Sequence, residues 1–331
     1  MPYIMQDFRI HTPQKAYKFL MQNLNIDINK AQRLINKGRV FYKGGALKNN
    51  EKARILSDFV SVLVFMPESK GLKPLFENEN FAIFNKPEKL LIHPKGRFYH
   101  YTLLDEVRHF CGEAAALAHR IDSETSGLVL VGKNKDSIKE LGELFLKGGI
   151  YKEYLALVGG ILSVESLEKF SFVEILSKNK FLINLPLATQ EKGGDLSVKS
   201  IVKGEVNNES LKFKEALSEC EILGFLESKN TLLKVIPKTG RTHQIRAHLN
   251  AINHSILGDP LYGAKNEFSR IYLDSTFILD SKPCDLDNKK RIEYFKASRL
   301  MLHSYLLGFR YKGESYKFYS SKNFEINGFM L

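Results

Sequence analysis

One short segment constrains the fold of this chain more than any other, because it separates two apolar regions that must form separate cores. The segment is PESKGLKP at residues 67–74, which combines two prolines and a glycine with polar side chains. Such a cluster interrupts regular structure and is typical of a linker. The 331 residues are enough for two domains of ordinary size. We therefore predict a small domain at residues 1–66, a linker at 67–74 and a large domain at 75–331.

The small domain combines helical and strand-like patterns. Apolar residues recur at helical spacing between residues 17 and 24, and a second helix is expected from about residue 29. Ala31, Leu34 and Ile35 would form the buried side of that second helix. The stretch KGRVFYKGGALKN then predicts a β-hairpin around Gly44 and Gly45, and FVSVLVF predicts a closing strand.

Positive charge is concentrated in this small domain. Residues 1–66 contain eleven Lys and Arg but only four Asp and Glu, which is +7 of the +12 that the whole chain carries. Such an excess fits a polyanionic partner, either nucleic acid or an acidic membrane surface, although a solvated helix face would show the same pattern. Because the charge coincides with a compact unit, we predict RNA binding. The residues expected to contact RNA are Lys30, Arg33, Lys37, Arg39 and Lys43.

The same region resembles the small RNA-binding domain first known from a ribosomal protein of the small subunit. GRVFYKGG matches the G-x-V-x-V-N-G pattern of that family, whereas QKAYKFL lacks the Arg and Asp of its R-L-D-x-F-L pattern. The resemblance implies two helices followed by a β-hairpin.

The large domain alternates strand-like and helical segments without a regular β-α-β rhythm. FAIFNKP, GLVLV and YLALV predict strands, with Tyr154 at the head of the last one, and DSIKELGELFL at 136–146 predicts a helix. There is no G-x-G-x-x-G or Walker loop, so a nucleotide-cofactor fold is poorly supported. Residues 160–215 show no clear pattern, and the cluster NKKR at 288–291 is interpreted as solvated surface.

Cysteine usage and hydropathy favour a cytoplasmic protein. Cys111, Cys220 and Cys284 are far apart and form neither a metal-ligand spacing nor an even disulfide framework. The first residues, MPYIMQDFRIHTPQ, lack the charged start and apolar core of a signal peptide. The longest apolar runs are far shorter than the roughly 18 residues that span a bilayer. We expect no membrane association, and a monomer is the default expectation.

Three further segments carry side chains suited to chemistry. HRIDSETSG contains Asp122, KEYLALV contains Tyr154, and GRTHQIRAHL predicts a helix that carries Arg246. A guanidinium on that helix could bind a carboxylate bidentately and keep it ionised. Each segment alone has an ordinary explanation, namely a structural ion pair for the aspartate and a core position for the tyrosine. The histidines of THQIRAH lack an H-E-x-x-H pattern and nearby cysteines, so no zinc site is expected.

Together and in this order, the segments resemble the RluA-type pseudouridine synthases. HRIDSETSGLVL, KEYLALV, RTHQIRAHL and HSILGDPLYG correspond to the family patterns H-R-L-D-x-x-T-S-G-L, K-x-Y-x-A, G-R-T-H-Q-I-R-x-H-L and P-I-x-G-D-x-x-Y-G. NKPEKLLIHP and RLMLHSYLLGF resemble the family's first motif and closing strand. The likeness covers most of residues 74–331, and His119 favours the RluA type over the related RsuA type. Lys89 stands where the family usually has glycine, and Ser255 where it usually has proline.

The resemblance implies an α+β fold, with a mixed, largely antiparallel catalytic sheet flanked by helices and a small α/β N-terminal RNA-binding domain. It implies isomerisation of uridine to pseudouridine in RNA, with no cofactor and no metal. It assigns catalysis to Asp122, as nucleophile or base, with Tyr154 and Arg246 as its partners. Residues implied to bind or position the substrate are His119, Arg120, Thr125, His243, Gln244 and Ile245.

The accessory domain favours large-subunit (23S) ribosomal RNA as the substrate, because the RluC and RluD branches that carry it mostly act there. Three alternatives stay open. The chain could modify tRNA, as other members of the family do. It could be a non-catalytic RNA-binding or ribosome-assembly protein, or a metal-dependent hydrolase that uses its histidines.

Overall fold

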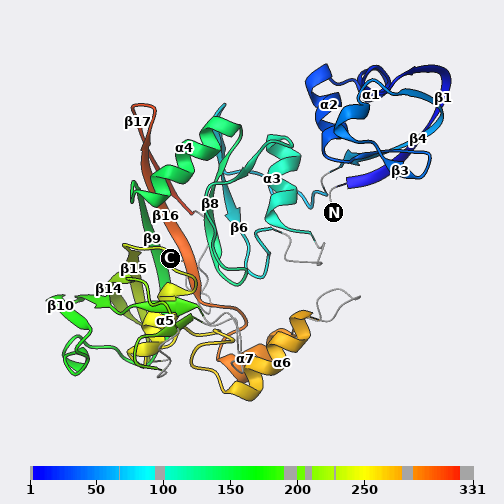
Figure 1. Ribbon diagram of the computed structural model, residues 1–331. Helices are drawn as coiled ribbons and strands as arrows, with labels where there is room; N and C mark the ends of the chain where they lie inside the picture. The colour runs from blue at the N-terminus through cyan, green and yellow to red at the C-terminus, as the bar shows by residue number, and fades with distance from the viewer. Residues whose placement is uncertain are drawn as a thin grey trace. The chain divides into compact units, whose positions relative to one another are not determined.

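The computed structural model describes residues 3–66, 68–93, 101–189, 200–205, 211–226, 229–277 and 286–320 (Figure 1). The chain divides between Gly71 and Leu72 into two compact units, which are described separately, and Tyr101 also belongs to the first unit. In the described part of the chain, no helix combines the length and the apolarity needed to cross a membrane. The predicted α+β fold class is confirmed.

The first unit is a four-stranded antiparallel sheet, ordered β1-β4-β2-β3, with two helices. Its elements are β1 (Tyr3–Lys15), α1 (Ala16–Leu24), α2 (Ile28–Asn36), β2 (Val40–Tyr42), β3 (Gly45–Ala46), the 3-10 helix η1 (Asn49–Glu51) and β4 (Ile55–Phe65). The two helices, the hairpin and the closing strand predicted from the sequence are confirmed. Strand β1 was missed, because its pairing with β4 joins residues about fifty positions apart and leaves no local signal.

Helix α2 illustrates how the sequence orients its basic residues. The Asp27 carboxylate caps the helix by accepting a hydrogen bond of 2.9 Å from the backbone N–H of Lys30. Ala31 and Ile35 lie one turn apart and are fully buried in the core of the unit. The solvent face of the helix therefore carries the exposed side chains of Lys30 and Arg33.

The second unit is built on an eleven-stranded sheet in the order β10-β11-β14-β15-β9-β16-β8-β6-β5, with β17 beside β16 and β7 beside β8 (Figure 1). Within the described strands of this sheet, β16 and β8 pair in parallel and the other pairs are antiparallel. The strands are β5 (Phe76–Glu77), β6 (Phe81–Lys86), β7 (Ala116–Leu117), β8 (Ser126–Gly132), β9 (Ile150–Gly159), β10 (Val173–Ser177), β11 (Lys180–Asn184), β14 (Leu217–Leu226), β15 (Asn230–Pro237), β16 (Leu302–Tyr311) and β17 (Glu314–Tyr319); β12 (Leu187–Thr189) and β13 (Ser200–Val202) form a separate pair.

Helices cover both faces of the β8 region. On one face, Leu128 and Leu130 pack in one cluster with Leu141 of α4 (Lys135–Leu146). On the other face, Val129 and Val131 pack with α3 (Leu103–Cys111). Because successive strand residues point to opposite faces, both faces must be apolar, which explains the uninterrupted GLVLV run. The helices of this unit are α3 (Leu103–Cys111), α4 (Lys135–Leu146), α5 (Gln244–Ala251), α6 (Asn266–Phe277) and α7 (Asn288–Phe295), with the 3-10 helix η2 (Glu165–Leu167).

The order of the central strands brings distant segments together. Strand β16 lies between β8 and β9, and its Ser304 is the register partner of Gly127 on one side and of Tyr154 on the other. The turn that precedes β8 is therefore placed close to Tyr154, although the two are separated by the whole of α4. This sheet order creates the site described below.

Three sequence interpretations were wrong. Tyr154 lies in the middle of β9, not at its head, because the strand already begins at Ile150. Residues 160–215, which showed no clear pattern, contain β10 to β13. The NKKR cluster is not wholly solvated, because it opens helix α7 and its Arg291 is fully buried.

Candidate active site

A tight turn presents Asp122 at the start of strand β8. The backbone N–H of Thr125 donates to the carbonyl oxygen of Asp122 at 3.1 Å and closes the turn, and the Thr125 side chain is buried. The second residue of β8, Gly127, must be glycine. Gly127 has a φ of +109°, and a Cβ there would lie 2.2 Å from the carbonyl oxygen of Ser304.

Arg246 reaches this turn from helix α5. Its guanidinium donates to both carboxylate oxygens of Asp259, through Nε at 2.7 Å and NH2 at 2.8 Å, and donates through NH1 to Asp122 at 3.1 Å. The guanidinium also lies over the Tyr262 ring, 5.2 Å from its centroid. The predicted pairing with Asp122 is therefore present, but the bidentate contact is made to Asp259. Two carboxylates share one buried cation, which fixes the guanidinium before any substrate binds.

Asp122 is the partly open member of this cluster. Its side chain is 25% exposed, whereas those of Arg246 and Asp259 are 2% and 1% exposed. Burial alone would raise the pKa of Asp122, but the electrostatic influence of His243 and Arg246 and the Arg246 hydrogen bond outweigh it and lower the pKa. Asp122 is consequently an ionised carboxylate that faces the surface, at neutral pH.

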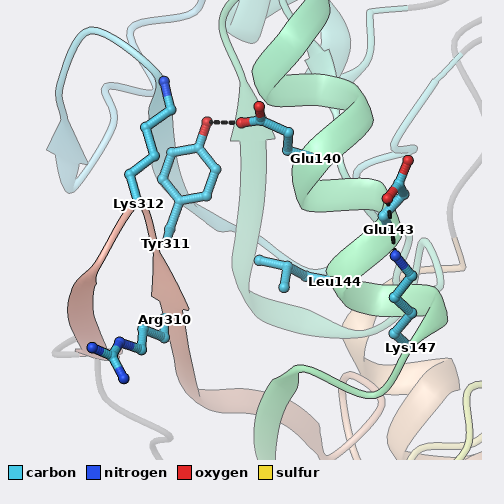
Figure 2. Close-up of a pocket in the computed structure, with 7 residues that line it drawn as sticks. All are labelled: Glu140, Glu143, Leu144, Lys147, Arg310, Tyr311 and Lys312. Carbon is cyan, nitrogen blue, oxygen red and sulfur yellow. Dashed lines mark hydrogen bonds and ion pairs between the residues drawn. The ribbon is translucent and has the colours of Figure 1, made fainter.

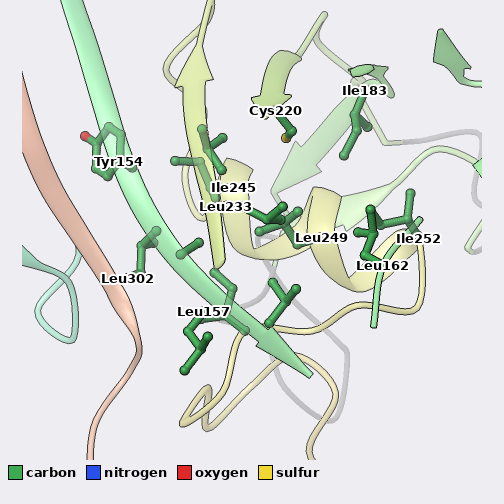
Figure 3. Close-up of a cluster of buried hydrophobic side chains, with 14 of the residues drawn as sticks. Tyr154, Leu157, Leu162, Ile183, Cys220, Leu233, Ile245, Leu249, Ile252 and Leu302 are labelled. Carbon is green, nitrogen blue, oxygen red and sulfur yellow. The ribbon is translucent and has the colours of Figure 1, made fainter. Parts of the chain in front are cut away.

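Tyr154 and Ile245 are buried side chains on two different elements of this unit. Both belong to one cluster of buried side chains, in which Tyr154 projects from β9 and Ile245 from α5 (Figure 3). Burial raises the pKa of Tyr154 to about 12, and the negative charge of Asp122 acts in the same direction, against a hydrogen bond with Ser304. The phenol is therefore protonated at neutral pH, and it is close enough to Asp122 for the carboxylate charge to affect its pKa.

His243 and Gln244 occupy the start of helix α5 with different functions. His243 Nε2 lies 3.8 Å from Asp122 Oδ1, and its Nδ1 is hydrogen-bonded to the Tyr262 hydroxyl at 3.2 Å. Gln244 is buried and ties the helix start to the sheet, since its amide donates to the carbonyl of Leu217 and its Oε1 accepts from the backbone N–H of Arg241. His243 thus faces the carboxylate, and Gln244 positions the helix.

The structure separates His119 from this group. Its Nε2 accepts a hydrogen bond of 3.0 Å from the backbone N–H of Leu130, and its ring stacks on Phe145 of α4 at 4.3 Å. Burial lowers the pKa of His119 to about 3, which keeps the ring neutral and able to accept. Its described contacts, with β8 and α4, are those of a structural residue. Arg120, in contrast, is exposed.

The five residues predicted to contact RNA lie together in the first unit. Lys30, Arg33 and Lys37 are exposed on α2 and at its C-cap, Lys43 is exposed in the hairpin turn, and Arg39 is half-buried before β2. They belong to consecutive elements of one compact unit, and their side chains are referred to below as its basic surface.

Comparison with known proteins decides the family. A profile described as RNA pseudouridylate synthase matches residues 80–251, which include Asp122, Tyr154 and Arg246. The chain belongs to the RNA pseudouridylate synthase family. It is therefore an RNA-modifying isomerase that converts uridine to pseudouridine, as the resemblance in its motifs implied.

Relatives of this synthase extend the match over nearly its whole length. An uncharacterized RNA pseudouridine synthase of Helicobacter pylori J99 is 36% identical over 322 residues, covering 96% of this chain and 95% of that protein. The ribosomal large subunit pseudouridine synthase D of Zymomonas mobilis is 27% identical over 264 residues, 74% and 75% of the two chains. The solved structure of human RNA pseudouridylate synthase domain containing 1 has a TM-score of 0.53 at 21% identity, covering 78% and 86%, and shows the shared fold.

Sequence reasoning missed three buried residues of the synthase that hold this site. The ammonium of Lys86, which is fully buried, donates to the carbonyl oxygens of Pro87, Leu90 and Ser123 at 2.8 to 2.9 Å, so all three of its protons are used. Burial lowers the pKa of Lys86 to about 7. The other two, Asp259 and Tyr262, lie in HSILGDPLYG. That motif was recognised as a pattern, but a pattern does not reveal which of its side chains meet Arg246.

Loop geometry accounts for one departure from the family pattern. Lys89, where the family usually has glycine, has a φ of +64°. The loop thus keeps the left-handed backbone that glycine adopts most easily.

A surface hollow of about 270 Å³ lies elsewhere on the synthase, between α4 and the β16–β17 turn (Figure 2). Four of its polar residues pair with one another, since the Tyr311 hydroxyl donates to Glu140 at 2.6 Å and Lys147 pairs with Glu143 at 3.1 Å. None of its lining residues belongs to the Asp122 cluster. Among the described residues, no group of three or more His, Cys, Asp and Glu is placed to hold a metal ion.

Proposed function

We propose that this synthase modifies uridines of large-subunit ribosomal RNA and that Asp122 is its essential carboxylate. The observation that supports the role of Asp122 most directly is the 3.1 Å contact from a guanidinium that Asp259 already holds bidentately. A carboxylate that is ionised, oriented and 25% exposed is suited to act on a substrate.

The reaction needs few protein groups. The bond between N1 of uracil and C1′ of ribose breaks, the base turns, and a bond forms between C5 and C1′. The proton on C5 is released and N1 gains one, so no electrons and no external group are required. Asp122 acts on the sugar either as a nucleophile or as a base, and the geometry is compatible with both.

The partners of Asp122 then have separate roles. Arg246 keeps the carboxylate charged and aimed, and because Asp259 fixes its guanidinium, this contact needs no reorganisation during the reaction. Tyr154 stacks on the uracil ring, and its protonated hydroxyl is available as a hydrogen-bond donor. Ile245 forms the apolar wall of the base pocket.

Reaching a uridine in structured RNA requires it to leave its stack, which costs a few kcal/mol. Arg120 is exposed and lies two residues before Asp122. In the proposed mechanism it occupies the space that the base leaves or braces the RNA around it. The basic surface of the first unit would hold the surrounding phosphates.

The ribosomal substrate rests on two supports. One is the relative named as a ribosomal large subunit pseudouridine synthase, and the other is the basic first unit, which resembles the accessory domain of enzymes acting on that RNA. Transfer RNA is the second candidate, since other members of the family modify it.

The test is release of tritium from C5 of uracil. Total RNA carrying 5-tritiated uracil, isolated from cells that lack the enzyme, is incubated with wild-type protein, with Asp122→Asn and with Asp136→Asn, an exposed aspartate on α4 as the matched control. Wild type and Asp136→Asn should release tritium, and Asp122→Asn should lose activity by a factor on the order of 10³ or more. Near-normal turnover by Asp122→Asn would remove the assignment, and size fractionation of the RNA separates ribosomal from transfer RNA.

A further inference from the structure

A second acidic residue of the Asp122 turn is held by a partner that lies far away in the sequence. Glu124, two residues after Asp122, is paired with Arg291 of helix α7, whose NH2 donates to Glu124 Oε2 at 2.6 Å. The Tyr272 hydroxyl of helix α6 donates to the other carboxylate oxygen at 2.9 Å. The Arg291 and Glu124 side chains are 0% and 7% exposed.

Among the described residues, the side chains of this pair are almost completely buried. The Arg291 guanidinium lies over the rings of Tyr272 and Phe295, 5.7 and 5.8 Å from their centroids. Taking two charges out of water is unfavourable, and only good geometry with further hydrogen bonds compensates for the lost hydration. A sealed carboxylate with this partner set has no access to RNA, so it serves the structure around Asp122.

Helix α7 also contacts the segment that carries Asp259. The carbonyl of Phe295 accepts a hydrogen bond of 2.7 Å from the backbone N–H of Gly258, which directly precedes Asp259. Arg291 and Phe295 are four residues apart and so lie on the same face of the helix. One helical turn thereby links the turn that presents Asp122 with the segment that presents Asp259, the two carboxylates that share Arg246.

Helix α6 and helix α7 are tied to each other and to α5. Phe268 of α6 stacks on Tyr294 of α7 with ring centroids 4.2 Å apart and planes 6° from parallel. Tyr272 and Phe295 pack in one cluster with Ala247 of α5 and with Tyr262, the ring beneath Arg246. The α6–α7 pair thus contacts the turn that carries Asp122, the helix that carries Arg246 and the segment that carries Asp259.

We propose that Arg291 is a positioning residue for the isomerisation and that the α6–α7 pair braces the catalytic turn against the Arg246–Asp259 pair. The proposal rests on the proposed catalytic role of Asp122. Glu124 occupies the third position of the Asp122–Thr125 turn, so a shift of its carboxylate moves the backbone that aims Asp122. Loss of the pair should therefore lower kcat and leave KM for RNA nearly unchanged, because Arg291 and Glu124 are buried side chains that RNA does not reach.

The experiment compares Arg291→Met with Lys290→Met, the same change at the preceding, exposed position of α7. Rates of tritium release are measured against the concentration of 5-tritiated total RNA, giving apparent kcat and KM. Arg291→Met should lose about 10- to 100-fold in kcat with KM within about threefold of wild type. Arg291→Lys, which keeps the charge, should recover part of the loss, and Lys290→Met should behave as wild type.

One further variant and a measurement of the folded fraction guard against misfolding. Arg291→Met leaves Glu124 buried without its cation, so the double variant Glu124→Gln with Arg291→Met is made to remove both charges together. The folded fraction of each variant is measured by near-ultraviolet circular dichroism at the assay temperature. The double variant should be folded and remain slow. The proposal is overturned if its kcat per folded molecule equals that of wild type, or if every loss follows the folded fraction alone.

Asp122→Asn in the same assay separates the two proposals. If Asp122→Asn is inactive and Arg291→Met is fully active, only the bracing role fails. If Asp122→Asn is active, the proposed role of Asp122 fails first, and the brace with it.

Discussion

Two acid–arginine pairs meet at the same turn, and they differ in the exposure of the acid and in the number of hydrogen bonds that it accepts. Asp122 and Glu124 are two residues apart, and each contacts a buried arginine on a different helix. The Asp122 side chain is 25% exposed and makes a single 3.1 Å contact with Arg246. The Glu124 side chain is 7% exposed and receives two hydrogen bonds, one from Arg291 and one from Tyr272.

The difference teaches that a buried cation alone does not mark a reactive carboxylate. Both cations remove much of the desolvation cost of their carboxylates. Glu124 is saturated and sealed, so its charge contributes to the structure. Asp122 keeps part of its surface open, and the charge requirement of Arg246 is met mainly by Asp259, which leaves Asp122 available for chemistry.

The largest expected effect tests this comparison through stability. Glu124→Ala leaves Arg291 buried without a carboxylate and should cost roughly 3–5 kcal/mol of unfolding free energy. Asp122→Ala should cost about 1 kcal/mol or less, because Arg246 keeps its bidentate contact with Asp259. Urea unfolding curves measure both. Equal losses would mean that the two pairs are structurally equivalent and would break the comparison.

A second prediction extends the comparison to cations on exposed side chains. Replacing Arg33 and Lys37 together by alanine should weaken RNA binding about tenfold at moderate salt and leave kcat and stability nearly unchanged. The slope of log affinity against log salt should fall by about 0.7–0.9 for each phosphate that the protein no longer neutralises. Filter binding over a salt series measures this, with Lys139→Ala on α4 as the exposed control. An unchanged slope would exclude these two residues from the RNA surface.

The smallest expected effect concerns pH. The pKa of Asp122 lies below its ordinary value, with His243 the largest of the lowering influences, followed by Arg246. A carboxyl group with a depressed pKa stabilises the folded state above its unfolded pKa of about 3.9, and that stabilisation is lost as pH falls through the folded pKa. Asp122 should therefore stay ionised, and the enzyme active, until the pH falls to the lowered pKa of Asp122. This pKa sets the acid limb of the pH–rate profile. In His243→Gln this limb should move to higher pH, as measured by tritium release across the pH range in which both proteins are folded. A limb that stays in place would show that His243 does not act on the charge of Asp122.

Much of this protein follows from local patterns. The helices of the first unit, the hairpin, α4, α5 and the buried strand β8 were predicted, because each depends on spacing within about a dozen residues. The family was also recognised, since its motifs occur as short runs in a fixed order. The edge strand β1, the strands between residues 160 and 215 and the burial of Arg291 were missed, because each depends on a partner far away in the chain.

The sequence by itself determined the chemistry available to this protein: the residue types at 122, 154 and 246, the basic surface of the first unit, and the apolar runs that force helices onto both faces of β8. Only the tertiary structure decided how those groups are used. The placement of β16 between β8 and β9 brings Asp122 toward Tyr154, and the pairing of Arg246 with Asp259 frees Asp122 from a bidentate contact. Glu124 and Asp122 are acids of the same turn, but Glu124 is buried and has a structural role, whereas the more exposed Asp122 is available to the substrate. The physical reason is that desolvation depends on all the atoms around a charge, and most of those atoms come from distant parts of the chain.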